Sequence, residues 1–149
     1  MYSRALGFVV LLAGVLGLGC TNAWDDRRQE LQRNRALWSS QGIHSYRYDF
    51  HRGCFCDSVA RLPVVITVAG DTTIAVVDSA TASPIPTARW PEYPTVDQLF
   101  STMAVRLESE SGSFAASYDP TLGYPRHVSS GSDIPDGGWG VVITVLAHE

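Results

Sequence analysis

Alternation of apolar and polar residues predicts β-strands in the first half of the chain. In the stretch SYRYDFH, residues 45–51, aromatic side chains alternate with polar ones, which is the period of two expected of a half-buried strand. Two β-branched runs follow at 64–68 and 73–77, with a Gly-Asp pair between them. Because such a pair favours a tight turn, the two runs predict a hairpin.

A helical period predicts one charged helix before these strands. Residues 25–40, DDRRQELQRNRALWSS, are mostly polar, and apolar residues recur every seven positions along one face. Asp25 or Asp26 is a suitable N-cap, and Gly42 stands where a left-handed C-terminal cap is expected. The apolar face carries Trp24, Leu31 and Trp38.

A second helix is predicted after Thr95. This threonine and Gln98 have the spacing of a capping box. Apolar residues then repeat at intervals of three and four, which indicates a helix with one buried face. These residues are Val96, Leu99, Phe100, Met103, Ala104 and Leu107.

The last part of the chain predicts three more strands, one ending near Tyr118 and two at about 126–130 and 140–146. The segment 79–94 between the two halves carries four prolines and is expected to be a covering loop or crossover. The predicted order is therefore α-β-β-β-α-β-β-β. It indicates an α+β fold, an antiparallel sheet of about six strands with two helices on one face.

The two halves of this order resemble each other. Each places a helix before a strand that contains Tyr-Asp, at Tyr48-Asp49 and at Tyr118-Asp119, and two more strands follow in each half. An internal duplication is the hypothesis that this similarity suggests.

The N-terminus has the composition of an export signal. Arg4 precedes an apolar run of about 14 residues, which is too short to cross a bilayer. The run ends in LGLGC, similar to a bacterial lipobox, so we expect residues 1–19 to be a signal peptide, Cys20 to be lipidated and residues 20–24 to be a tether. The alternative is cleavage after Ala23. A single domain is then expected at 25–149.

Charge excludes one class of partner. Of 11 basic and 15 acidic residues, only Arg4 lies in the leader, so the domain is mildly acidic. Every basic residue is arginine and none forms a run. Nucleic-acid binding depends on clustered basic side chains, so we expect no nucleic-acid partner.

Cys54 and Cys56 are open to several interpretations. In an exported chain a disulfide is expected. Residues two positions apart in a regular strand have Cα atoms about 6.5 Å apart, at the upper edge of the disulfide range, so the chain must bend at Gly53 or Phe55. A redox pair, free thiols or a metal site formed by His51, Cys54 and Cys56 are the alternatives.

Aromatic residues beside prolines offer a candidate binding surface. Trp90, Tyr93 and Tyr124 stand in RWPEYP and GYP, and rigid aromatic side chains dominate interface energetics. Packing of the proline-rich loop onto the sheet explains the same residues.

Catalytic motifs are absent from the sequence: it has no Gly-x-Ser-x-Gly, His-Glu-x-x-His, phosphate-loop or dinucleotide pattern. We therefore expect a non-enzymatic binding or accessory module without a cofactor. It is expected in the cell envelope, on the periplasmic or extracellular face of a membrane to which its lipid anchors it, with an envelope protein or a ligand as partner. The alternative is a metal-binding or thiol-redox protein centred on residues 51–56.

Three blocks of the sequence are similar to one known family. LWSSQGIHSYRYDFHRGCFC, YPTVDQLFSTM and ASYDPTLGYPRHV resemble the blocks of bacterial lipoproteins with the DUF6174 domain, from about residue 37 to the C-terminus. The resemblance implies an exported, anchored domain with no established activity and no functional residues to carry over. One departure is that the acidic cluster usual after Gly-Tyr-Pro is broken here, in DIPDGG at 133–138, by proline and glycines.

Overall fold

The computed structural model describes residues 22–109, 112–131 and 138–148. The elements in this part of the chain alternate between helices and groups of strands, as the periodicity predicts. In chain order they are α1 (Ala23–Ser40), β1 (Tyr46–Cys54), β2 (Val64–Ala69), β3 (Thr72–Asp78), the 3-10 helix η1 (Thr87–Glu92), α2 (Val96–Glu108), β4 (Ser113–Tyr118), β5 (Pro125–Gly131) and β6 (Trp139–His148).

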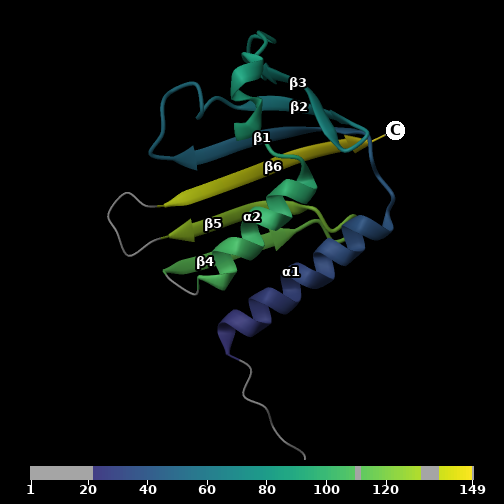
Figure 1. Ribbon diagram of the computed structural model, residues 1–149, viewed down its shortest axis with the longest axis vertical. Helices are drawn as coiled ribbons and strands as arrows, with labels where there is room; N and C mark the ends of the chain where they lie inside the picture. Colours follow the sequence, from purple (N-terminus) through teal and green to yellow (C-terminus); the bar gives the residue numbers. More distant parts are fainter. Residues whose placement is uncertain (1–21, 110–111, 132–137, 149) are drawn as a thin grey trace, which may run out of the picture.

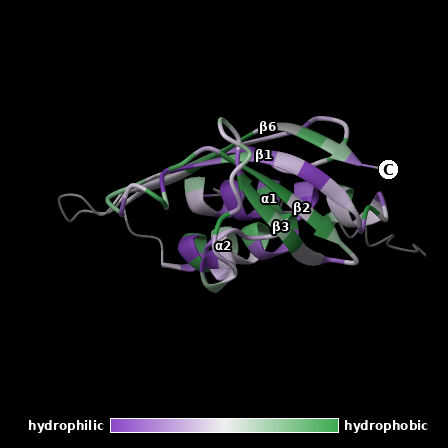
Figure 2. Cartoon of the chain, turned by 90° about the horizontal axis from the view of Figure 1, so that it is seen from above, coloured by the Kyte–Doolittle hydropathy of each residue, from purple (hydrophilic) through white to green (hydrophobic). Residues whose placement is uncertain are grey.

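All six strands form one antiparallel sheet in the order β3-β2-β1-β6-β5-β4. Strands β1 and β6 lie at its centre, and α1 and α2 cross the same face (Figure 1). Seen from above, both helices lie below the sheet (Figure 2). The predicted α+β class, the number of strands and the element order are confirmed.

Alternation along β1 places its aromatic residues in the core. Tyr46, Tyr48 and Phe50 are buried, with 4%, 2% and 2% of their surface exposed. Their partners on β2 are buried as well, since Tyr48 pairs with Ile66 and Phe50 with Val64. The core therefore lies between this face of the sheet and the two helices.

The first helix begins two residues before the predicted position, because its N-cap is Asn22. The Asn22 Oδ1 accepts hydrogen bonds from the backbone N–H groups of Trp24 and Asp25, at 3.0 and 2.9 Å. The prediction of Asp25 or Asp26 as the cap is wrong, and both lie inside the first turn. The predicted C-terminal glycine is confirmed, since Gly42 has φ +64°.

The second helix begins as predicted. The Thr95 hydroxyl accepts the Gln98 N–H at 3.3 Å, and the Gln98 side chain accepts the Thr95 N–H at 2.9 Å. This reciprocal capping box satisfies two backbone donors that a helix start leaves without partners. Its predicted apolar face is confirmed by the burial of Val96, Leu99, Phe100, Met103 and Leu107.

The internal duplication stays a hypothesis. In the sheet order β3-β2-β1-β6-β5-β4, the three strands of each half of the chain are neighbours. The position of β1 at the centre and of β4 at an edge follows from placing two such groups side by side, so it does not decide whether the halves are related.

The proline-rich segment covers the edge of β3 and then forms η1. The Asp78 N–H donates to the Ser83 carbonyl at 2.9 Å, and the Ile85 N–H donates to the Val76 carbonyl at 2.9 Å. The expected covering loop is thus present, but the sequence reading missed the 3-10 turn that follows.

Candidate functional site

The strongest candidate is a short loop at the end of β1, residues 54–57, here named the CFC loop. Gly53 is still paired with Gly140 of β6, and the chain bends at Phe55 and Cys56. The bend brings the Cα atoms of Cys54 and Cys56 to 5.3 Å. The two sulfurs lie at disulfide-bonding distance, and of the two bends that the sequence allowed, the one at Phe55 is formed.

The side chain at the tip of the CFC loop points into solvent. Phe55 is 79% exposed, more than the other exposed large hydrophobic side chains of the described residues, Val105 at 66% and Ile74 at 53%. A single exposed apolar residue is common. This one differs because its two neighbours are held together, so the loop is restrained on both sides of the ring.

An arginine from η1 holds the other end of the CFC loop. The two Nη atoms of Arg89 donate to the two carboxylate oxygens of Asp57 at 3.0 and 2.8 Å. The same guanidinium donates through Nε and Nη2 to Glu92, at 2.9 Å each. Paired N–H···O bonds of this kind fix direction as well as distance. Asp57 Oδ1 also caps the next turn by accepting the Ala60 N–H at 3.0 Å.

These contacts change the protonation of the loop carboxylate. Hydrogen bonds from Arg89 lower the pKa of Asp57 to about 2, and the same contacts raise the pKa of Arg89. A second arginine, Arg52, lies 5.7 Å from the ring centres of both Phe50 and Tyr93, and burial lowers its pKa. The site therefore keeps its charges in fixed pairs next to the CFC loop.

The metal-binding alternative needs His51, Cys54 and Cys56 to converge. His51 belongs to the exposed row of β1, whereas Cys54 follows the parity of the buried row, so the two side chains start on opposite faces of the sheet. Among the residues that the structure describes, no group of three or more His, Cys, Asp or Glu side chains could hold a metal ion. A metal or redox role of this segment stays a prediction.

The aromatic residues of the proposed binding surface do not form one. Tyr93 and Tyr124 are buried, with 1% and 6% exposed. Trp90 is half-buried and donates its Nε1–H to the Ile85 carbonyl at 3.0 Å. The prediction of a shared surface of Trp90, Tyr93 and Tyr124 is corrected, because both tyrosines pack into the core. Tyr93 contacts Phe50 of β1, and Tyr124 contacts Trp38 of α1.

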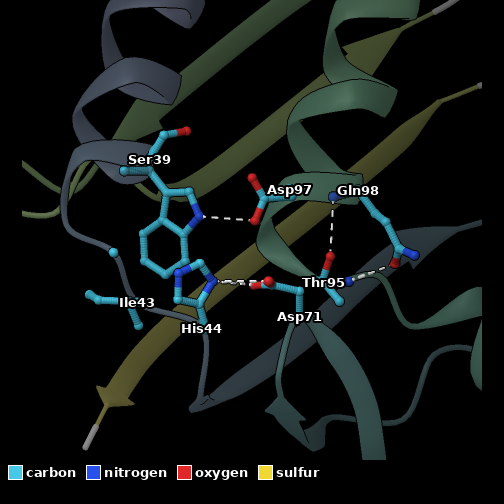
Figure 3. A pocket seen from close by; sticks show the side chains of 9 residues that line it. Ser39, Ile43, His44, Asp71, Thr95, Asp97 and Gln98 are labelled. Atoms are coloured by element: carbon cyan, nitrogen blue, oxygen red, sulfur yellow. Dashed lines mark hydrogen bonds and ion pairs between the residues drawn. The ribbon is translucent and has the colours of Figure 1, made fainter.

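A hollow of about 350 Å³ lies between the end of α1 and the start of α2 (Figure 3). His44 Nδ1 lies 2.9 Å from Asp71 Oδ2, and Trp38 Nε1 donates to Asp97 Oδ2 at 3.2 Å. The hollow also contains the capping box of α2. The polar groups of this hollow therefore connect segments of the fold to one another. Because these segments are far apart in the chain, the sequence alone did not predict the hollow.

Part of the predicted site lies outside the described residues. Cys20, the signal peptide and the first residues of the tether belong to this part, as do residues 133–137. No helix in the described ranges is both long enough and apolar enough to cross a membrane.

The described residues form an α+β fold that presents a restrained aromatic side chain at the CFC loop. The family model of DUF6174, a family of unknown function, matches residues 30–144, so the chain belongs to this family. The match includes both helices in whole or part and the CFC loop. No curated protein and no solved structure matches the chain.

Proposed function

We propose that this chain is an exported, non-enzymatic binding or accessory module, anchored to a membrane of the cell envelope through a lipid on Cys20. In this proposal the CFC loop makes the contact, and its partner is an envelope protein with an apolar pocket that receives Phe55. The observation that carries the proposal is the 79% exposure of Phe55 at a loop restrained on both sides.

Restraint is what makes an exposed ring suitable for binding. A flexible loop loses conformational entropy when a partner orders it, at a cost of about 0.5–1.5 kcal/mol for each immobilised side chain. The Cys54–Cys56 contact and the Arg89–Asp57 pair restrain the backbone of the loop before any partner arrives. Aromatic residues that enter a pocket are typical interface anchors.

The paired charges next to the CFC loop also suit a protein contact. Arg89 is shared between Asp57 and Glu92, and Arg52 lies 3.7 Å from Glu92. Because these charges are already compensated, an approaching apolar surface does not leave one of them without a counter-ion. We therefore expect Phe55 to supply most of the binding energy and the charged pairs to supply orientation.

Site-specific crosslinking tests the contact. A photoreactive phenylalanine analogue at position 55 is expected to crosslink one defined protein in intact cells. The same analogue at Val105, which is 66% exposed on α2, serves as the matched control and is expected to give no defined product. In a pull-down without any crosslinker, Phe55→Ser should lose the same protein without a lower melting temperature. Equal products at both positions would contradict the proposal.

Anchoring needs its own test, because contact and anchoring can fail separately. Intact mass of the mature protein from membranes is expected to show an N-terminal Cys20 carrying acyl chains. Cys20→Ser should move the protein to the soluble envelope fraction, since several acyl chains bind a bilayer far more strongly than one. A mature protein that begins at Trp24, without acyl mass, would instead establish cleavage after Ala23.

A further inference from the structure

The two edges of the sheet differ in how they are protected. On the outer edge of β3 the chain folds back, with an Asp78–Ser83 and an Ile85–Val76 backbone hydrogen bond and an isolated bridge between Val77 and Pro84. Strand β4, at the other end of the sheet, pairs with β5 on one side. On its other side, no segment of the described residues hydrogen-bonds to it.

Strand β4 also lacks the usual devices that protect an edge. Its sequence, SFAASY, has no charged residue and no proline, whereas natural edge strands commonly carry lysine or proline that disfavours further pairing. Its one irregularity lies at the end, between Ser117 and Tyr118. The strand is therefore a continuous, uncharged row of backbone donors and acceptors.

The direction of these groups follows from the turn after β4. The Asp119 N–H donates to the Tyr124 carbonyl at 2.8 Å, toward β5. Backbone groups alternate in direction along a strand, so those of Ser117, Ala115 and Ser113 also face β5. The N–H and C=O groups of Phe114 and Ala116 then face away from the sheet.

We infer that the free edge of β4 binds an extended, uncharged segment of a partner polypeptide, which adds to the sheet as a seventh strand. An extended backbone is the chemistry that matches a row of alternating N–H and C=O groups. The outer face of β4 carries only small side chains, those of Ser113, Ala115 and Ser117. They would not sterically exclude any particular side chain of an added strand. This surface is separate from the CFC loop, since β5 and β6 lie between β4 and β1.

A single strand fits this edge better than a second copy of the chain. The first turns of α1 extend past β4 on the helix-covered side (Figure 1). A copy related by a two-fold axis at the β4 edge would bring its own α1 into the helix layer that α1 and α2 already fill. A lone extended segment occupies the plane of the sheet and meets no second helix layer.

Amide hydrogen exchange tests this inference with a defined probe, the acetylated and amidated peptide SFAASY. When the peptide is added to the full domain, we expect exchange at Phe114 and Ala116 to slow by at least about tenfold. The same peptide N-methylated at every residue is the matched control. It has no N–H to donate on either edge, and its methyl groups obstruct pairing on both edges, so it should leave the exchange unchanged without altering the protein.

Variants of the protein supply the second arm. Ala116→Pro removes an outward N–H and should abolish protection by the peptide, whereas Ala116→Ser keeps that N–H and should preserve it. Three results would overturn the inference. They are equal protection by both peptides, slow exchange at Phe114 and Ala116 before any peptide is added, and protection that rises with protein concentration alone, which would identify a second copy as the occupant.

Discussion

Arg89 and Asp57 form a two-pronged pair between η1 and the CFC loop, with Nη1 to Oδ1 at 3.0 Å and Nη2 to Oδ2 at 2.8 Å. The two residues are 32 positions apart in the sequence. Their pairing connects the candidate contact loop to the segment that leads into α2. The orientation of Phe55 thus depends on a residue that no local motif associates with it.

Replacing Arg89 by glutamine is expected to raise the pKa of Asp57 from about 2 toward its ordinary value of 3.8. In the unaltered protein the folded pKa is lowered, so the stabilising contribution is present above about pH 4 and is lost as pH falls through 2. NMR titration of the Asp57 carboxyl carbon measures this change. Arg61→Gln, in an exposed arginine of the same region, should leave the titration where it was.

Alkylation followed by intact mass should distinguish the states of Cys54 and Cys56. We expect two alkyl groups only after reduction, because the Cα atoms lie 5.3 Å apart, within the range of a disulfide. The Cys54→Ser, Cys56→Ser double variant should lose no more than about 1.5 kcal/mol of stability, since a three-residue loop removes little unfolded-state entropy. Alkylation without reductant, or metal in the same sample, would instead support the metal or redox alternative.

Replacing Tyr46 by phenylalanine should destabilise the domain by about 1–2 kcal/mol at neutral pH. The Tyr46 hydroxyl accepts the Val96 N–H at 2.9 Å at the buried start of α2, and the variant leaves that donor without its partner. Urea denaturation measures the change. Val105→Ala, on the exposed side of the same helix, should change stability by less than about 0.5 kcal/mol.

The same tyrosine should make the domain sensitive to alkali. Burial raises the pKa of Tyr46 from 10 to about 12, so between these values the unfolded chain binds fewer protons and stability falls as pH rises. The free energy of unfolding, measured from pH 9 to 12, should fall less steeply with pH in Tyr46→Phe than in the unaltered protein. The decline should not vanish, because burial raises the pKa of Tyr48 as well.

Two glycine substitutions should differ sharply in effect. At Gly123, with φ +84°, an added Cβ would lie 2.5 Å from the Asn34 carbonyl oxygen and 3.0 Å from the Trp38 nitrogen, both backbone atoms of α1. Gly123→Ala should therefore cost about 2–4 kcal/mol, from left-handed strain and overpacking together. Gly42→Ala, at φ +64° with open space around it, should cost only about 1–2 kcal/mol. Equal losses in chemical denaturation would contradict this account.

The elements of this fold were predictable because each depends on residues close together in the chain. The alternation at 45–51 and the Thr95–Gln98 capping box act within a few positions, and both are confirmed. The cap of α1 was misplaced by three residues, since Asn22 competes with Asp25 for the same role. Such competition is decided by which backbone donors each side chain can reach.

Long-range contacts decided the rest. Local sequence patterns were enough to predict the class of fold, the six strands and two helices, and the need for a bend at the cysteine pair. Only the tertiary structure placed β6 beside β1, buried Tyr93 and Tyr124, brought Arg89 to Asp57 and left Phe55 exposed. Periodicity reports which side of an element is apolar. It carries no information about which distant segment covers that side, because this depends on the packing of the whole chain.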